Sequence, residues 1–165
     1  MSSYHHRFPS PLGDVLVTVD EAGALTRLSL PDHDQRSAPP AHDSRPDAAR
    51  CAHVGRALEA YFGGDAQALD ALELAPQGTP FQLDVWRALR RVRAGTTTTY
   101  KQLAAAAGHP RAIRAVGAAN GANRIALALP CHRVIGSDGK LTGFAFGLER
   151  KRALLELEGA LPAQA

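Results

Sequence analysis

Apolar and polar residues alternate over an early part of the chain, in the stretch GDVLVTVDEAGALTRLSL. The turn sequence Glu-Ala-Gly at residues 21–23 interrupts the alternation, so this stretch predicts a hairpin of two strands. Residues 31–47 are polar, rich in proline and without a period, and we expect them to form a loop. A helical pattern then covers residues 47–63 and ends near Gly63. The first part of the chain is therefore expected to combine strands with a helix.

Helical periodicity dominates the second half of the chain. The stretch PFQLDVWRALRRV repeats apolar residues at spacings of four and three, which predicts one amphipathic helix. In the next stretch, TTTTYKQLAAAAGHPRAIRAVGAAN, Thr98 or Thr99 can cap a short helix, which Gly108 can end. Pro110 can begin a second helix that runs through Ala119. Two helices joined by a turn that contains glycine are typical of a helix-turn-helix.

A short apolar run, IALALP, predicts a buried strand over residues 125–130, which Pro130 stops. Cys131 follows directly, with His132 and Arg133 next along the chain. Because the thiolate is the nucleophilic form of cysteine, a reactive cysteine needs a base or a positive charge close by. Cys131 is therefore the candidate nucleophile.

A carboxylate that orients a histidine would complete such a pair of nucleophile and base. Three candidates, Glu149, Glu156 and Glu158, lie on the helix that LERKRALLELEG predicts, and Gly159 can end this helix. The helical period does not decide which glutamate faces the cysteine.

The length of 165 residues and the apolar content of 45% permit one large domain or two small ones. Charge is unevenly distributed along the chain. Residues 1–80 hold 6 Lys and Arg against 11 Asp and Glu, whereas residues 81–165 hold 13 against 5. The basic half suits a polyanion such as DNA, and it is equally consistent with a solvated basic face.

No apolar run is long enough to cross a bilayer, and the start MSSYHHRFPS lacks the regions of a signal peptide. We therefore expect a cytoplasmic protein without membrane contact, in which the thiols stay reduced and Cys51 is a core residue. These residues indicate a DNA-binding pair of helices with a nucleophilic cysteine. A thiol hydrolase or a redox sensor would share the cysteine.

Three stretches together resemble the O6-alkylguanine-DNA alkyltransferases, also called methylated-DNA-protein-cysteine methyltransferases. They are GTPFQLDVWRAL, TTTTYKQLAAAAGHPRAIRAVGAAN and LPCHRVIGSDGKLTGFAFGLERKRALLELEG, and the likeness runs without a gap over residues 78–159. The earlier stretch FPSPLGDVLVTVDEAGALTRLSL resembles the amino-terminal domain of that family. The resemblance implies an α/β domain at residues 1–77, with a small ribonuclease-H-like sheet and a helix. It implies a mostly α, winged-helix-like DNA-binding domain at residues 78–165.

The resemblance also implies direct repair of double-stranded DNA. The protein would rotate O6-alkylguanine, and also O4-alkylthymine, out of the duplex and transfer the alkyl group irreversibly to Cys131, once per molecule. It would need no cofactor and act as a monomer that can cluster on DNA. The alternative is a protein that binds alkylated DNA with little or no transfer.

Family positions supply further roles by resemblance. His132 would accept the thiol proton through a water while Glu158 orients it, and Asn123 would brace the segment before Cys131. Arg114 would fill the gap left by the extruded base, and Tyr100 would press on the neighbouring phosphate. The other expected DNA contacts are Arg111, Ile113 and Arg133, and the expected pocket residues are Val134, Phe144, Ala145 and Phe146, with a loop at residues 141–147 closing over the base.

Several residues depart from the family pattern. Arg124 stands where proline is usual, and Phe144 stands where tyrosine is usual, which removes a hydroxyl. Phe146 replaces a glycine or tryptophan, so we expect a narrow pocket that prefers methyl over benzylic adducts. Ile113 replaces a small residue that faces the minor groove, and it either weakens groove insertion or turns inward. The donors in the first half fit no zinc pattern, so no metal is expected; they are His5, His6, His33, His42, Cys51 and His53.

Overall fold

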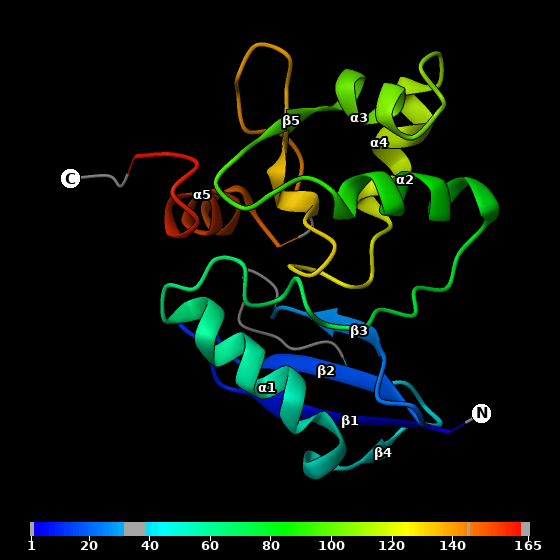
Figure 1. The fold of residues 1–165 in the computed structure, drawn as a ribbon, viewed down its shortest axis with the longest axis vertical. Helices are drawn as coiled ribbons and strands as arrows, with labels where there is room; N and C mark the ends of the chain where they lie inside the picture. The colour runs from blue at the N-terminus through cyan, green and yellow to red at the C-terminus, as the bar shows by residue number, and fades with distance from the viewer. Residues whose placement is uncertain (1, 32–38, 145, 163–165) are drawn as a thin grey trace. The chain divides into compact units, whose positions relative to one another are not determined.

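The structure is a computed structural model that describes residues 2–31, 39–144 and 146–162. The chain forms two compact units (Figure 1). The first unit consists of Met1–Pro76 and Arg124–Ala128, and the second consists of Gln77–Asn123 and Leu129–Ala165. Within the described ranges, no helix is long and apolar enough to cross a membrane.

The first unit is built on a sheet with the strand order β3-β2-β1-β4. Its strands are β1 (Ser3–Phe8), β2 (Val15–Asp20), β3 (Leu25–Ser29) and β4 (Arg45–Pro46). The antiparallel pair of β2 and β3 confirms the predicted hairpin, and Gly23 in its turn has a φ of +87°, which favours glycine. β1 pairs antiparallel with β2, while β4 pairs parallel with β1.

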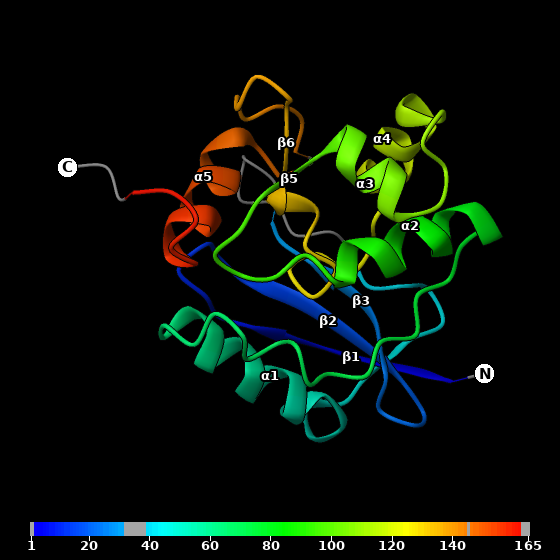
Figure 2. The same cartoon turned by 45° about the horizontal axis from the view of Figure 1, so that its top comes forward.

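Helix α1 (Ala48–Phe62) lies along one face of this sheet (Figures 1 and 2). Asp47 caps it by accepting a hydrogen bond from the Arg50 amide, so the helix predicted over residues 47–63 is confirmed. Gly55 allows the helix to approach the sheet closely, because a Cβ there would overlap the Phe8 ring. Cys51 on α1 is fully buried, as expected of a core residue.

The loop predicted over residues 31–47 is partly described. Residues 32–38 lie outside the described part of the chain. In residues 39–47, turns lead into the two-residue strand β4. This strand was not predicted, because the stretch shows no alternation of apolar and polar residues.

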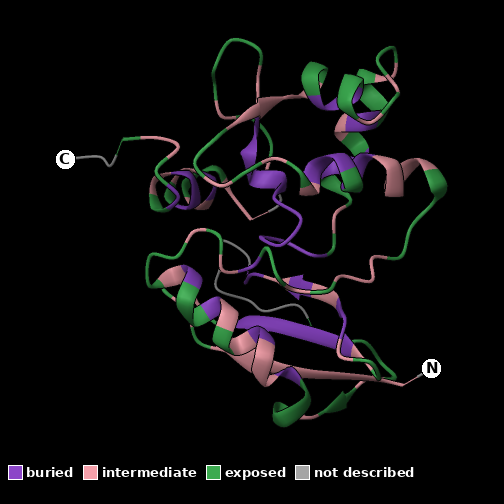
Figure 3. Ribbon diagram, in the orientation of Figure 1, coloured by how far each residue is buried: buried purple, intermediate pink, exposed green. Residues whose placement is uncertain are grey.

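A segment from later in the chain completes the first unit. The Leu28 amide donates to the Arg124 carbonyl oxygen, and the Ala126 amide donates to the Leu28 carbonyl oxygen, both at 3.0 Å. The buried strand predicted over residues 125–130 is wrong, because Ile125 makes one bridge and Leu127 then turns the chain with a φ of +69°. Burial of the run is nevertheless complete (Figure 3). The apolar run therefore correctly indicated that the segment is buried, but it did not show that the backbone is extended.

The second unit is mostly helical. Its elements are α2 (Pro80–Arg90), β5 (Thr98–Thr99), α3 (Tyr100–Ala106), α4 (Ile113–Gly121), the 3-10 helix η1 (Cys131–Arg133), β6 (Val134–Ile135) and α5 (Leu148–Leu157). α2 and α3 both begin with a capping box, in which Thr79 pairs with Gln82 and Thr99 pairs with Gln102. These helices confirm the predicted amphipathic helix and the first helix of the helix-turn-helix. The α/β first unit and the mostly α second unit agree with the expected fold class.

The second helix of the helix-turn-helix begins later than predicted. Pro110 lies in a turn that the Ala112 amide closes by donating to the His109 carbonyl oxygen at 3.0 Å. Ala112 has a non-helical backbone, so α4 starts at Ile113 and runs to Gly121. Trp86 of α2 holds this helix, since its Nε1–H donates to the Ala119 carbonyl oxygen at 2.9 Å.

Candidate active site

Cys131 is the first residue of η1 and is 8% exposed. Burial raises the pKa of its thiol. Smaller influences oppose this rise: a hydrogen bond from Asn123, the charge of Lys151, and the backbone amides of residues 131 and 132. The resting group is therefore a neutral thiol that has stabilising partners in place for a thiolate.

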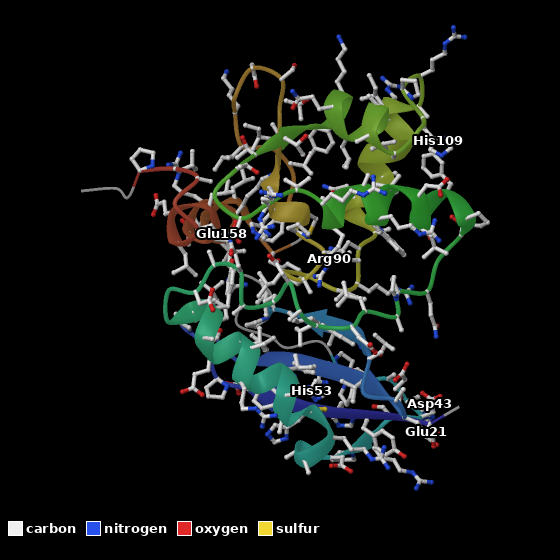
Figure 4. The ribbon with its side chains drawn as sticks, viewed as in Figure 1. Glu21, Asp43, His53, Arg90, His109 and Glu158 are labelled. Atoms are coloured by element: carbon white, nitrogen blue, oxygen red, sulfur yellow. The ribbon has the colours of Figure 1, made fainter. Side chains whose placement is uncertain are left out.

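His132 and Glu158 form a hydrogen-bonded pair with no exposed side-chain surface. The two groups are 2.7 Å apart, from Nε2 of the histidine to Oε2 of the glutamate. Glu158 lies at the end of α5 and is labelled in Figure 4. Burial opposes ionisation of Glu158, but hydrogen bonds from His132 and Arg133 outweigh it and lower the pKa to about 2. A carboxylate only accepts hydrogen bonds, so His132 Nε2 carries the hydrogen and Nδ1 is the basic nitrogen. Among the described residues, no hydrogen-bond partner lies on this buried Nδ1.

Burial lowers the pKa of His132, and the hydrogen bond to Glu158 opposes that change. The imidazole is consequently neutral at rest and free to accept a proton at Nδ1. Of the three glutamates considered from the sequence, the structure brings Glu158 to the histidine.

Arg133 is only 4% exposed, which contradicts its predicted role as a DNA contact. Its Nε and Nη2 donate to Glu158 at 2.8 Å and 3.0 Å, and its Nη1 donates to the Val92 carbonyl oxygen at 2.6 Å. The guanidinium is turned inward because the buried carboxylate needs a charged partner. Arg133 thus belongs to the network behind His132.

Lys151 was missed in the sequence, although a signal was present. It lies three and four residues before Leu154 and Leu155, on the apolar side of the predicted helix, and it is completely buried. Its Nζ donates to the carbonyl oxygens of Val134 at 2.5 Å, Thr142 at 2.6 Å and Gly143 at 3.3 Å. Burial lowers the Lys151 pKa to about 8, against the influence of the Cys131 thiolate, which raises it.

Asn123 lies between the end of α4 and Cys131 in the chain. Its Nδ2 donates to the Leu129 carbonyl oxygen at 2.7 Å. The contact closes the loop that passes through the first unit, so the side chain braces the backbone just before the cysteine.

The residues expected to meet DNA lie on and around α3 and α4. Arg111, in the turn, and Arg114, on the first turn of α4, are both exposed. Ile113 is 39% exposed, so the alternative in which it turns inward is wrong. Tyr100 begins α3 with its ring over Gly117 and its hydroxyl 3.5 Å from the Thr142 carbonyl oxygen.

The expected pocket residues follow Cys131. Val134 is buried and its carbonyl oxygen accepts from Lys151. Phe144 and Phe146 meet edge to face with their ring centroids 5.5 Å apart. Ala145 lies outside the described residues.

Within the described ranges, no group of three or more His, Cys, Asp or Glu side chains could hold a metal ion. A cavity of about 450 Å³ lies in the first unit and contains none of the expected site residues. Its lining residues include Asp20, Glu21, Arg50, His53 and Glu73.

Comparison with known proteins identifies relatives of both units. Residues 3–76 match the ribonuclease-like domain of 6-O-methylguanine DNA methyltransferase, and residues 80–160 match its DNA binding domain. A methylated-DNA-protein-cysteine methyltransferase of Methanosarcina barkeri is 48% identical over 155 residues, which are 94% of this chain and 96% of that protein. The crystal structure of Mycobacterium tuberculosis O6-methylguanine methyltransferase is 39% identical, with a TM-score of 0.81, and the match covers 98% of this chain and 96% of that one. A structure of that Mycobacterium tuberculosis protein in complex with DNA matches with the same identity and TM-score over 97% and 94% of the two chains.

Proposed function

The chain belongs to the 6-O-methylguanine DNA methyltransferase family, and from that premise we propose that it repairs O6-alkylguanine in double-stranded DNA by transferring the alkyl group to Cys131. The observation that carries this proposal is the buried pair of His132 and Glu158, whose histidine directly follows Cys131 in the chain. The histidine Nδ1 has no hydrogen-bond partner among the described residues and can accept a proton.

The reaction begins with activation of the thiol. Its proton moves to His132 Nδ1 through a water, and Glu158 stabilises the imidazolium that forms. Arg133 holds the carboxylate through two hydrogen bonds and keeps it ionised. The buried ammonium of Lys151 favours the thiolate electrostatically.

Transfer is a single displacement at the alkyl carbon. The Sγ electron pair forms the new carbon–sulfur bond while the bond from carbon to guanine O6 breaks, and its electron pair moves into the guanine ring. A proton taken up at guanine N1 restores the normal base. The product thioether has no route to hydrolysis in this site, so each molecule reacts once, and no cofactor takes part.

Lys151 also shapes the pocket in this proposal. Its three hydrogen bonds tie the Val134 carbonyl to the loop at Thr142 and Gly143, directly before Phe144. In the same proposal, the Val134 carbonyl oxygen also accepts from the guanine amino group.

Double-stranded DNA is the proposed partner. The DNA complex of the Mycobacterium tuberculosis relative supports this, as do the exposed Arg111 and Arg114 at the beginning of α4. Arg114 takes the place of the extruded base, and Tyr100 and Ile113 contact the strand around it. We further propose that residues 78–165 carry binding and chemistry, with residues 1–77 as support, in a monomer. Both cysteines are free thiols, in keeping with a cytoplasmic protein.

The test is intact-protein mass spectrometry with peptide mapping, after equimolar protein is mixed with a duplex that carries one O6-methylguanine. We expect one methyl group on Cys131 and restored guanine in the DNA. Cys131→Ala should abolish transfer and retain binding, and Cys51→Ala is the matched control. Tight binding without any transfer would instead identify a protein that only recognises damage.

A further inference from the structure

His109 connects the turn of the helix-turn-helix to a third helix. Its Nε2 lies 3.0 Å from Asp84 Oδ2 on α2, and its ring meets the Phe81 ring edge to face, with centroids 4.7 Å apart. In Figure 4, the His109 side chain points toward α2. Because the carboxylate can only accept, His109 donates this hydrogen bond.

The backbone of the same residue joins the two helices of the motif. The His109 amide donates to the Ala104 carbonyl oxygen at 2.9 Å and closes the end of α3. Its carbonyl oxygen accepts from the Ala112 amide at 3.0 Å, immediately before α4 begins at Ile113. Just before His109, Gly108 turns the chain with a φ of +82°. His109 therefore contacts the end of α3, the turn before α4, and α2.

In the described part of the chain, the start of α4 has no side-chain cap. The N-cap of α4 is Ala112, which makes no side-chain capping bond. The exposed Arg111 and Arg114 lie on both sides of that weak helix start. Their direction depends on how firmly the turn is held.

We propose that His109 is a positioning residue for DNA binding, which uses Asp84 and Phe81 of α2 to hold the turn and thereby aims Arg111 and Arg114. The proposal rests on the function proposed above. His109 acts through these arginines and makes no phosphate contact of its own.

The experiment measures two quantities for each variant: affinity for an unmodified duplex over a range of salt concentrations, and the rate of alkyl transfer from duplex and from the free O6-methylguanine base. His109→Ala should lower duplex affinity and duplex repair about tenfold, the combined effect of a hydrogen bond and an aromatic contact. The free-base rate should stay within about twofold, because that reaction needs no helix-turn-helix.

The salt dependence separates positioning from direct contact. A residue that binds a phosphate changes the slope of log affinity against log salt by about one when removed, as we expect for Arg114→Ala. His109→Ala should leave this slope unchanged. A reduced slope would show that His109 binds phosphate itself and would overturn the proposal.

Three further variants keep the test decisive. His109→Gln retains a donor for Asp84 and should recover part of the affinity, while Asp84→Ala should add little to His109→Ala. Arg87→Ala removes the other side-chain partner of Asp84, at 3.2 Å, and is the matched control with near-normal affinity. If wild-type protein repairs DNA and His109→Ala equals it, the positioning role is refuted; if the wild type neither binds nor repairs DNA, the proposed function itself fails.

Discussion

Glu158→Gln should destabilise the protein by about 3 kcal/mol near neutral pH. The Glu158 pKa is lowered from 4.5 to about 2, and each pKa unit corresponds to about 1.4 kcal/mol of preference for the ionised form in the folded state. Removal of one partner from a buried ion pair costs a similar amount, about 3 to 5 kcal/mol. Glutamine also places an amide N–H against a donor of His132 or Arg133. For a chain of this size the loss corresponds to a melting temperature lower by about 10 °C.

Urea unfolding of wild type and Glu158→Gln at several pH values measures this effect. A carboxyl group with a lowered folded pKa stabilises the fold fully above its unfolded pKa, and that stability is lost as pH falls toward the folded pKa. The difference between the two proteins should therefore be complete above about pH 5 and shrink toward about pH 3. Glu149→Gln, an exposed change on the first turn of α5, is the control and should cost less than about 1 kcal/mol. Equal urea midpoints for wild type and Glu158→Gln, or a difference independent of pH, would refute the reasoning.

Lys151→Met should slow alkyl transfer from the free base, measured by quenched-flow kinetics, because the thiolate loses a nearby ammonium; an unchanged rate would exclude that role. Above the folded Lys151 pKa of about 8, the unfolded chain holds the lysine proton that the folded protein has lost. The free energy of unfolding of the wild type, measured in urea, should therefore rise relative to that of Lys151→Met from about pH 8 to about pH 10. Arg114→Ala should slow repair in duplex far more than transfer from the free base, and equal losses on both substrates would remove its role in extrusion. Phe146→Gly should speed the reaction of O6-benzylguanine more than that of O6-methylguanine, and a constant ratio would show that the ring does not narrow the pocket.

Local signals predicted the helices well. Of the two caps predicted for the first helix of the helix-turn-helix, Thr98 and Thr99, the structure uses Thr99, whose side chain makes the capping bond. Strand β1 was not predicted from its residues, because all six of them are half-buried and show no alternation. Pairing with β2 defines this strand, and pairing is a long-range property.

Without the family resemblance, the candidate site could be predicted only as far as residue types and their adjacency in the chain allow. Cys131 and His132 are neighbours in the chain, whereas Glu158 reaches them through the folding of α5, which the helical period does not specify. Arg133 was expected to contact DNA, and its inward direction is explained by the buried carboxylate of Glu158, which comes from a distant part of the chain. The sequence places Lys151 on the apolar face of a predicted helix, which signals a buried charge. Its three carbonyl partners come from two other segments of the chain, so they could not be predicted from that face.

The passage of Arg124–Ala128 through the first unit has a consequence for how the molecule can be divided. The polypeptide leaves the first unit after Pro76, returns at Arg124 and leaves again after Ala128. A fragment that begins at residue 78 would carry the acceptor cysteine together with the apolar loop of residues 125–128. This loop is almost fully buried in the whole protein and would lose the unit in which it is packed. A fragment that ends at residue 77 would leave Leu28 without its partners on the sheet edge. The two halves therefore cannot be exchanged between relatives as independent modules. A chimera that takes residues 1–76 from a relative must also take residues 124–128 from it.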